Sequence, residues 1–172
     1  MEPSYKHLLN DIRAFVFDVD GVMTDGSLYL MEGEQYRVMN IRDGYAIVEA
    51  IKAGYHVMVI SGGDSDSVRE RLNGLGVREV HLGISDKSAM FNELLSKHGL
   101  QTKEVMYMGD DLPDYRVIQL AGMKVCPSDA IPEIKRLCHY VSPYTGGKGC
   151  VRDVIEQVMR VHGRWPFQSE HR

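Results

Sequence analysis

Short apolar runs rich in β-branched residues alternate with longer stretches of helical periodicity along most of the chain. The helical stretches at 66–76 and 86–99 space their apolar residues three and four apart, and each ends at a glycine. Apolar strands separated by helices are typical of a parallel sheet, because each crossover helix covers one face of the sheet. The sequence therefore predicts an α/β fold of three layers, a Rossmann-like parallel sheet with helices on both faces. The predicted strands are 14–19, 56–61, 79–83, 104–109, 124–127 and 139–142.

One segment after the first predicted strand breaks this alternation. Residues 27–40 contain two strand-like runs that flank Glu-Gly-Glu at 32–34, a pattern that indicates a β-hairpin. We therefore expect a hairpin, not a helix, to follow the first strand. The length of 172 residues suits one domain, so we predict a single domain over residues 1–172, whose polar tail from about Trp165 is a candidate disordered segment.

The balance of charged and apolar residues argues against several classes of protein. The formal net charge of −4 disfavours a nucleic-acid binder, which would carry a basic excess or patch. No apolar stretch approaches the roughly 18 residues of a membrane span, and the N-terminus has no apolar signal core. We therefore expect a cytoplasmic protein with neither nucleic acid nor membrane as a partner. Cys126, Cys138 and Cys150 are widely spaced and form no CxxC pair, so we interpret them as reduced structural thiols.

Chemically useful side chains follow four of the predicted strands, at the carboxyl end of each. Open parallel sheets bind ligands beyond the carboxyl ends of their strands, so these side chains should gather at one edge. Taken singly, an aspartate in such a place usually caps a helix or a turn. Capping does not easily explain why such residues follow four strands in order, so we interpret the set as a functional site. Its members are Asp18, Asp20, Ser61, Gly62, Lys87, Asp110, Asp111 and Asp114.

These residue types suit the chemistry of phosphate esters. Asp18 and Asp20 lie two positions apart, so both point into one space if strand geometry continues that far. With Asp110 they offer the hard oxygen ligands that Mg²⁺ prefers, and the cation would offset the repulsion between clustered carboxylates. Ser61 and Lys87 are donors of the kind that hold phosphate oxygens. A carboxylate beside Mg²⁺ and opposite such donors is equipped to attack phosphorus and form an aspartyl-phosphate.

The same residues carry a resemblance to the haloacid dehalogenase superfamily of phosphohydrolases. The four motifs of that superfamily occur here in their usual order. They are DVDGV at 18–22, ISG at 60–62, DK at 86–87 and GDDLPD at 109–114.

The resemblance implies a role for each member of the site. Asp18 would be the nucleophile, and Asp20 would act first as general acid and then as general base. Asp25, nearby in the sequence, is interpreted as a structural residue of the hairpin. The phosphoryl group would be bound by Ser61, Gly62 and Lys87. Magnesium would be held by Asp18, Asp110 and the backbone carbonyl of Asp20, with Asp111 and Asp114 in support.

A response-regulator receiver is an alternative that uses the same chemical parts. Receivers also hold an aspartyl-phosphate with clustered aspartates, a Ser or Thr, a Lys and Mg²⁺. Their phosphorylated aspartate, however, lies on a middle strand and their acidic pair at the first. Here Asp18 and Asp20 follow the first strand and a second acidic cluster follows the fourth, so the order favours the phosphohydrolases.

Many relatives in this superfamily carry a cap domain that closes the site, and this sequence leaves no room for one. The interval from Asp18 to Ser61 holds the hairpin and one helix, and that from Ser61 to Lys87 holds one helix and one strand. An open site exposes chemistry that normally benefits from exclusion of water. We therefore expect a large substrate or a neighbouring subunit to close it. The hairpin, with apolar Leu28, Leu30, Tyr36 and Val38, is the candidate oligomer contact.

A narrower resemblance covers residues 11–163. The chain is similar to capless (C0) phosphatases that act on the 8- and 9-phosphates of eight- and nine-carbon 2-keto-3-deoxy sugar acids, notably those for 3-deoxy-D-manno-octulosonate (KDO) 8-phosphate. This resemblance implies a homotetramer in which a neighbouring subunit completes each site. It also implies a role in supplying KDO for lipopolysaccharide in Gram-negative bacteria. Gly63 and Gly74 stand where the nine-carbon (KDN 9-phosphate) branch tends to carry Glu and Lys, which favours the eight-carbon substrate.

Further contacts to the sugar acid are open to alternatives. Arg71 is the candidate ligand for the substrate carboxylate, and a solvated helix arginine is the alternative. Asn40 and Asp43 are candidates for the sugar hydroxyls, and capping of the next helix by Asp43 is the alternative. The glycine-rich loop 146–149 is a weaker candidate for a phosphate-facing loop.

A function of another class also uses this fold. Related domains occur as non-catalytic oligomerising modules attached to sugar-nucleotide synthetases. Such a module can lose its catalytic residues without harm, whereas this chain has all of them, so we favour the enzyme.

Overall fold

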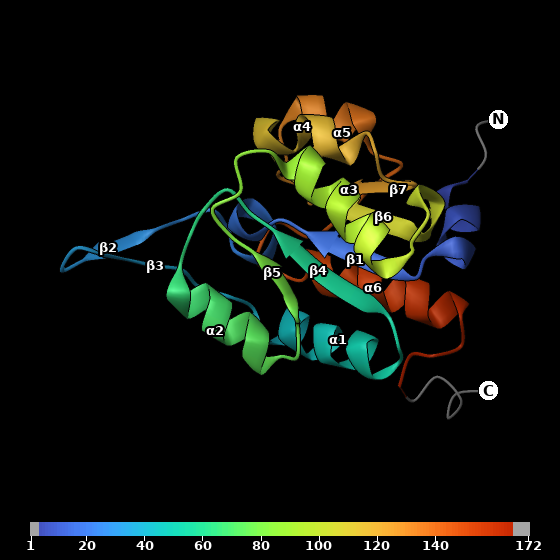
Figure 1. The fold of residues 1–172 in the computed structure, drawn as a ribbon, viewed down its shortest axis with the longest axis horizontal. Helices are drawn as coiled ribbons and strands as arrows, with labels where there is room; N and C mark the ends of the chain where they lie inside the picture. The colour runs from blue at the N-terminus through green and yellow to red at the C-terminus, as the bar shows by residue number, and fades with distance from the viewer. Residues whose placement is uncertain (1–3, 167–172) are drawn as a thin grey trace.

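A six-stranded sheet forms the centre of the computed structural model, which describes residues 4–166 (Figure 1). Its strand order is β5-β4-β1-β6-β7-β8, and every pairing is parallel. The chain builds one half of the sheet outward from β1, then crosses over and builds the other half, so the order reverses between β1 and β6. The strands are β1 (Ala14–Phe17), β4 (His56–Ile60), β5 (Glu79–His81), β6 (Val105–Met108), β7 (Met123–Cys126) and β8 (Tyr140–Val141).

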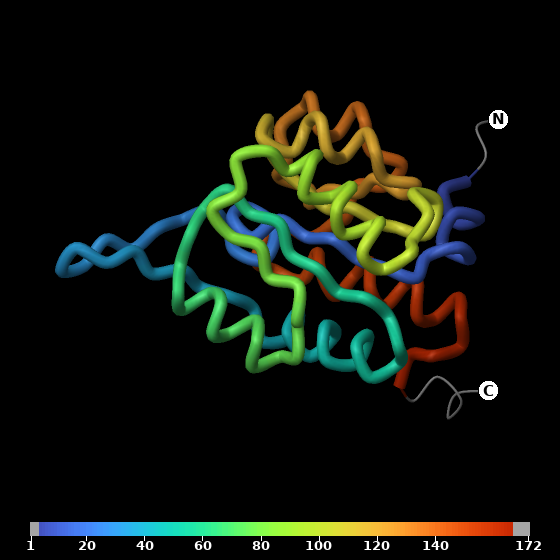
Figure 2. The backbone as a smooth tube through the Cα atoms, viewed as in Figure 1, coloured from blue at the N-terminus to red at the C-terminus, as the bar shows by residue number. Residues whose placement is uncertain are grey.

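Helices cover both faces of this sheet, which confirms the predicted three-layer α/β fold. Buried side chains of α1, α2 and α6 pack on one face, and those of α3, α4 and α5 pack on the other. The colours of Figure 2 show that α1 and α6 lie side by side although they are far apart in the sequence. The helices are α1 (Ile41–Lys52), α2 (Asp66–Gly74), α3 (Lys87–His98), α4 (Tyr115–Ile118), α5 (Pro132–Leu137) and α6 (Cys150–Val161). Short helical turns occur at Tyr5–Asp11, Val19–Met23, Thr102–Glu104 and Leu112–Asp114.

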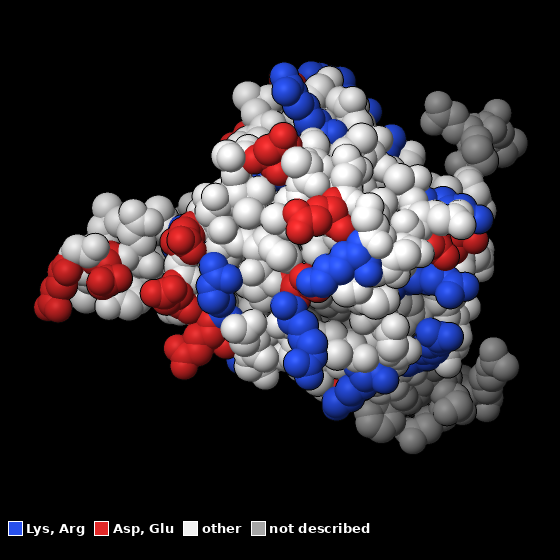
Figure 3. Space-filling view, in the orientation of Figure 1, with Lys and Arg blue, Asp and Glu red and all other residues white. Residues whose placement is uncertain are grey.

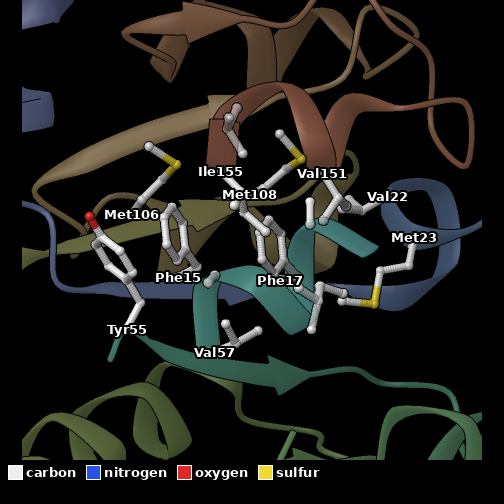
Figure 4. Close-up of a cluster of buried hydrophobic side chains, with 14 of the residues drawn as sticks. Phe15, Phe17, Val22, Met23, Tyr55, Val57, Met106, Met108, Val151 and Ile155 are labelled. Atoms are coloured by element: carbon white, nitrogen blue, oxygen red, sulfur yellow. The ribbon is translucent and has the colours of Figure 1, made fainter. Parts of the chain in front are cut away.

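The central strand β1 is fully buried because it supplies both layers of the core. Phe15 and Phe17 point to the α1/α6 face, while Ala14 and Val16 point to the α3 face, as strand alternation requires. Figure 4 shows the two phenylalanine rings among methionines of β6 and side chains of α6 such as Ile155. Truncation of such a phenylalanine to alanine typically costs about 3–5 kcal/mol. This packing fixes the end of β1, where Asp18 follows.

Strand β1 ends at Phe17, earlier than the predicted end at residue 19. The Asp18 carboxylate accepts a hydrogen bond from the N–H of Val19 at 2.7 Å, and the chain turns at once into the helical turn Val19–Met23. Gly21 lies in this turn with a φ of 81°, a conformation that glycine adopts readily. The strand therefore does not continue to Asp20, so the condition under which alternation would aim Asp18 and Asp20 into one space is not met.

The predicted hairpin is present as an arm that projects from the body of the molecule (Figure 1). It consists of β2 (Tyr29–Met31) and β3 (Glu34–Tyr36), joined at Glu32 and Gly33, both with positive φ. That geometry belongs to a two-residue turn whose twist matches the strands. Figure 3 shows acidic side chains gathered along this arm. The arm also exposes apolar side chains, namely those of Leu28, Tyr29, Leu30, Met31, Tyr36 and Val38.

Several smaller predictions concern the rest of the chain. Only the helical turn Val19–Met23, the hairpin and α1 separate β1 from β4, and only α2 and β5 separate β4 from α3, so no cap domain interrupts the described residues. The three cysteines are free. No helix within residues 4–166 is both long and apolar enough to cross a membrane. Trp165, where the tail was expected to begin, is buried and makes an edge contact with Tyr45, while residues 167–172 lie outside the described part.

Candidate active site

The carboxyl ends of β1, β4 and β6 lie next to one another, where the strand order reverses. This is the place at which open α/β sheets bind ligands. The pairing of Phe17 with Met108 brings the residues that follow these two strands together, and the N–H of Asp18 donates to the carbonyl of Met108 at 3.1 Å. The β1 and β6 motifs predicted from the sequence therefore meet at one edge of the sheet.

Lys87 links two of the carboxylates at this edge. It is the first residue of α3, and its ammonium lies 2.9 Å from the Asp18 carboxylate and 2.8 Å from the Asp114 carboxylate. All three side chains are buried, so these are strong charge-assisted contacts that water screens little. Burial opposes the charge on Lys87, but the two carboxylates outweigh it and raise the pKa of Lys87.

Asp114 is the hub of the hydrogen-bond network. One of its oxygens accepts from Lys87 and from the hydroxyl of Tyr107, each at 2.8 Å. The other accepts from the backbone N–H of Asp110 at 3.1 Å. The side chain of Asp114 is fully buried, so its charge depends on these donors. Asp114 thus orients both Lys87 and the backbone that carries Asp110.

The carboxylates of Asp18, Asp110 and Asp114 form a cluster that can hold a metal ion, with one oxygen from each within 4.8 Å of the others. Burial, and then the charge of Asp114, raise the pKa of Asp18 to about 7. Burial, and then the charge of Asp18, likewise raise the pKa of Asp110 to about 7. Like charges held this close are relieved by a cation, and an all-oxygen donor set fits Mg²⁺.

Two glycines keep this cluster compact. A Cβ at Gly21 would lie 2.0 Å from an oxygen of Asp110, and a Cβ at Gly109 would lie 2.4 Å from the Cγ of Asp114. No side chain fits at either position while the carboxylates keep their places. The glycines of two motifs therefore allow the turns that follow β1 and β6 to bring these carboxylates close together.

Asp20 makes a contact that sequence reasoning missed. Its carboxylate lies outside the cluster of Asp18, Asp110 and Asp114 and pairs with the guanidinium of Arg37, which follows β3 of the hairpin. Arg37 is the one basic residue in segment 27–40. The sequence pattern of that segment predicts a hairpin but does not indicate that Arg37 belongs to the site. Its partner lies 17 positions earlier, so only the path of the hairpin brings the two together.

Ser61 stands at the carboxyl end of β4, as predicted. Its backbone N–H donates to the carbonyl of His81 at 2.9 Å and its carbonyl accepts from Ile84 at 3.0 Å, which fixes the residue next to β5. The residue is buried, whereas the following Gly62 is exposed. An open hollow of about 540 Å³ adjoins the site on the side of Lys87, between Ser85–Ser88 and Leu112–Arg116.

Three candidate substrate residues, Asn40, Asp43 and Arg71, make structural contacts within the chain. Asn40 caps α1, accepting from the N–H of Arg42 and of Asp43, so the cap suggested for Asp43 belongs to Asn40. The buried Asp43 accepts from the N–H of Arg152 at 2.8 Å and ties α1 to α6. The exposed Arg71 lies against Gly44 of α1. A direct role of Asn40, Asp43 or Arg71 in binding substrate stays a prediction.

The remaining predicted residues lie around the cluster. Asp111 is exposed and accepts from the N–H of Leu112, which starts the short turn before α4. Asp25 accepts from the N–H of Ser27 where the hairpin begins, a structural contact. The glycine-rich loop 146–149 packs on the turn after β1, where a Cβ at Gly146 would lie 2.1 Å from the carbonyl oxygen of Gly21.

Comparison with known proteins identifies a family with this architecture. A family model for haloacid dehalogenase-like hydrolases matches residues 76–155. The 3-deoxy-D-manno-octulosonate 8-phosphate phosphatase of Yersinia pestis is 38% identical over 150 residues, which cover 87% of this chain and 80% of that protein. Its counterpart in Escherichia coli K12 is 36% identical over 155 residues, covering 90% and 82% of the two chains.

Solved structures agree with these sequence matches. The Y. pestis phosphatase superimposes with a TM-score of 0.91 at 35% identity, covering 94% of this chain and 88% of that one. A Moraxella catarrhalis phosphatase in complex with magnesium, phosphate and KDO gives 0.89 at 27% identity, covering 93% and 92%. A cobalt-bound Haemophilus influenzae phosphatase gives 0.87 at 32% identity, covering 91% and 92%.

Proposed function

The chain belongs to the haloacid dehalogenase-like hydrolases, and on that premise we propose that it is a magnesium-dependent phosphomonoesterase that hydrolyses KDO 8-phosphate. The observation that carries the proposal is the buried contact of Lys87 with Asp18 and Asp114 at the point where the strand order reverses. This contact aims a cation and a carboxylate at the same place, which is what attack on a phosphate monoester requires.

The reaction divides into two displacements at phosphorus. In the first, an oxygen of Asp18 bonds to phosphorus as the bond to the ester oxygen breaks, and Asp20 gives its proton to the departing alcohol. In the second, water attacks the aspartyl-phosphate and gives a proton to Asp20, which releases phosphate and restores Asp18. Ser61, the backbone at Gly62 and Lys87 would hold the phosphoryl oxygens throughout.

Magnesium would be held by Asp18, Asp110 and the backbone carbonyl of Asp20, with Asp114 and Asp111 close by. The buried carboxylate cluster supports this assignment, and so does the magnesium in the M. catarrhalis phosphatase. When bound, Mg²⁺ would neutralise charge on the phosphoryl group during the displacement. We expect its removal to abolish activity.

The eight-carbon substrate is the finer part of the proposal. It is supported by the curated relatives, which are KDO 8-phosphate phosphatases at 36–38% identity. Gly63 and Gly74, which differ from the residues that the nine-carbon branch tends to carry, favour the same substrate. KDN 9-phosphate is the alternative substrate, and a non-catalytic oligomerising module is the alternative of another class. We also propose a cytoplasmic homotetramer whose neighbouring subunits complete the open sites, and the exposed apolar side chains of the hairpin support association between subunits.

A direct assay separates these possibilities. Phosphate release is measured from KDO 8-phosphate and KDN 9-phosphate in parallel, with Mg²⁺ and with EDTA. The variants are Asp18→Asn and, as a matched control on an exposed aspartate of the next turn, Asp25→Asn. We expect magnesium-dependent preference for KDO 8-phosphate that is lost in Asp18→Asn and kept in Asp25→Asn. Preference for KDN 9-phosphate would overturn the assignment of KDO 8-phosphate as the substrate. A folded wild type that is inactive on both substrates would favour the non-catalytic oligomerising module.

A further inference from the structure

Arg37 of the hairpin grips the carboxylate of Asp20, and we propose that it positions Asp20 for proton transfer. In this role Arg37 anchors one carboxylate oxygen with a short hydrogen bond and holds the other by a longer one, so the second oxygen can exchange a proton at the ester oxygen or at water. The inference rests on the proposed phosphatase function, in which Asp20 is the general acid and base. It adds a positioning residue that lies outside the four sequence motifs.

The two hydrogen bonds between Arg37 and Asp20 are unequal. The Nε of Arg37 donates to Oδ1 of Asp20 at 2.6 Å, whereas Nη2 donates to Oδ2 at 3.2 Å. A charge-assisted bond as short as the first holds its oxygen in place, while the second is at the long end of the usual range. Oδ1 is therefore the anchored oxygen, and Oδ2 is the one available to the substrate.

The two side chains also differ in their exposure to solvent. The side chain of Asp20 is 37% exposed, whereas that of Arg37 is only 6% exposed. Arg37 is thus the enclosed partner of the pair, and Asp20 is the partner that solvent and a substrate can reach. Such an arrangement orients the carboxylate without occupying the place where a substrate must come.

One donor of Arg37 has no partner, although it is buried. The Nη1 atom of Arg37 makes no hydrogen bond within residues 4–166. A buried unpaired donor is unfavourable, and a contact selected only to fasten the hairpin to the body would not be expected to keep one. The orientation of the guanidinium is instead dictated by Asp20, which fits a positioning role.

Gly63 completes the arrangement by leaving room for it. A Cβ at residue 63 would lie 2.8 Å from Oδ2 of Asp20 and 3.2 Å from Nη2 of Arg37. The absence of a side chain at Gly63 therefore keeps the less tightly held oxygen unobstructed. The turn after β1, the segment after β3 and the loop after β4 converge on this one carboxylate.

The test compares two leaving groups. Departure of the sugar alcohol from KDO 8-phosphate needs a proton, whereas 4-nitrophenyl phosphate releases a stable anion and needs little help from an acid. The ratio kcat/KM covers the steps up to alcohol release, so it reports the acid role of Asp20. We expect Arg37→Met to lower kcat/KM for KDO 8-phosphate on the order of 100-fold, and that for 4-nitrophenyl phosphate by less than about threefold. Arg37→Lys should lower kcat/KM for KDO 8-phosphate less than Arg37→Met does, because lysine keeps the positive charge but lacks the planar pair of N–H donors.

A double-mutant cycle shows whether Arg37 acts through Asp20. Asp20→Asn should reproduce the selective loss on KDO 8-phosphate, and adding Arg37→Met to it should cause no further loss. Arg13→Met is the matched control, because Arg13 pairs with Glu104 beside the opposite end of β1. It should leave both substrates unaffected. Thermal unfolding of each variant identifies any loss that follows from misfolding.

The outcomes distinguish the inference from the function on which it rests. Equal losses on both substrates, no loss in Arg37→Met, or additive losses in the double mutant would each overturn the positioning role while the proposed function stands. A folded wild type that releases no phosphate from KDO 8-phosphate would overturn the proposed function, and the role of Arg37 with it.

Discussion

Lys87 is the residue on which the buried charges of the site depend. It is the cation nearest to both Asp18 and Asp114 in the described structure, at 2.9 and 2.8 Å. Lys87→Met keeps the length of the side chain but leaves two buried carboxylates without this partner. Removal of one member of a buried ion pair typically costs about 3–5 kcal/mol, so we expect a loss of that size in the free energy of unfolding at neutral pH without Mg²⁺. Urea unfolding measures it, and phosphatase activity should be lost as well.

The matched control for this prediction is Lys52→Met. Lys52 pairs with Glu49 at 2.8 Å on the surface of α1, three positions away. Surface pairs of this kind contribute little, so the free energy of unfolding should change by less than about 1 kcal/mol. Equal destabilisation by the two substitutions would contradict the role assigned to Lys87.

Gly63 allows a prediction that separates activity from stability. The atoms that a Cβ at this position would meet are the ends of two side chains, those of Asp20 and Arg37, which can move. Gly63→Ala should therefore fold normally but displace the Asp20 carboxylate. A displacement of this size at a catalytic group can reduce kcat by up to about 100-fold. Steady-state kinetics and thermal unfolding, measured on the same sample, test both halves of the expectation.

Gly74→Ala is the control within the same region. Gly74 is the last residue of α2, and a Cβ there would meet nothing within 4 Å. Alanine is the better helix former, so this substitution should leave kcat unchanged and stabilise the protein by up to about 1 kcal/mol. Full activity in Gly63→Ala would show that the space beside Asp20 is not needed.

Individual residues of the site differ in how far the sequence alone identifies them. Asp18 and Lys87 follow strands and carry the right chemistry, so their meeting could be predicted from topology. Arg37 could not, because its contact with Asp20 depends on the course of the hairpin through space. Asn40 and Asp43 show the opposite case, since their residue types suit substrate binding but backbone N–H groups already bond to the side-chain oxygen of Asn40 and to Oδ1 of Asp43.

Among the elements, the edge strand β5 is tied to α3 through a single carboxylate. Glu79 accepts contacts from His81 at 2.9 Å, Lys97 at 2.7 Å and His98 at 2.9 Å. Burial opposes the charge of Glu79, but the contacts outweigh it and lower the pKa of Glu79 from 4.5 to about 2. A lowered pKa means that the folded state favours the charged form, so this stabilisation is present above about pH 4.5 and is lost as the pH falls toward 2.

Glu79→Gln tests this link between two elements. At pH 7 we expect the substitution to reduce the free energy of unfolding by about 1 kcal/mol, because the contacts are only partly shielded from water. The difference from wild type should shrink as the pH falls from about 4.5 toward 2. Unfolding curves at several pH values measure it, with Glu133→Gln, which breaks an exposed pair with Arg136 on α5, as the control. A difference that is constant with pH would contradict the assignment.

The elements themselves were predicted well in their centres and less well at their ends. The apolar runs predicted all six strands of the sheet, because strands that are buried on both faces are apolar along nearly their whole length. The end of β1 was misplaced because Asp18 bonds to the next backbone N–H and turns the chain, a local contact that the apolar pattern does not contain. The short α4 likewise follows from the capped turn at Asp111 and not from periodicity.

The fold of residues 4–166 places the site at the carboxyl edge of the sheet and leaves it open on the side of Lys87. The helices bury both faces of the sheet, whereas the edge that carries Asp18, Lys87 and Asp110 adjoins an open hollow. The hairpin, which supplies Arg37 to the site, exposes its own apolar side chains to solvent. The same arm can therefore serve the chemistry at its base and association along its length, and the two roles are separable by substitution.

Association through the hairpin predicts an oligomer that a single substitution dissociates. Leu30 of β2 is 73% exposed and lies among other exposed apolar side chains, and such a patch on a two-stranded arm is unfavourable unless a second copy covers it. We expect wild type to sediment as a defined assembly and Leu30→Arg to sediment as a smaller species, because burial of a charge without a partner is unfavourable.

Val161→Arg is the control for this experiment, because Val161 is an exposed apolar residue at the end of α6 and not on the arm. It should leave the assembly intact, as measured by sedimentation velocity. If neighbouring subunits complete the open sites, dissociation by Leu30→Arg should lower kcat/KM for KDO 8-phosphate more than for the smaller 4-nitrophenyl phosphate, which needs fewer contacts beyond the phosphoryl group. A monomeric wild type with full activity would contradict this account of the hairpin. Closure of the site by the substrate itself would then be the remaining explanation.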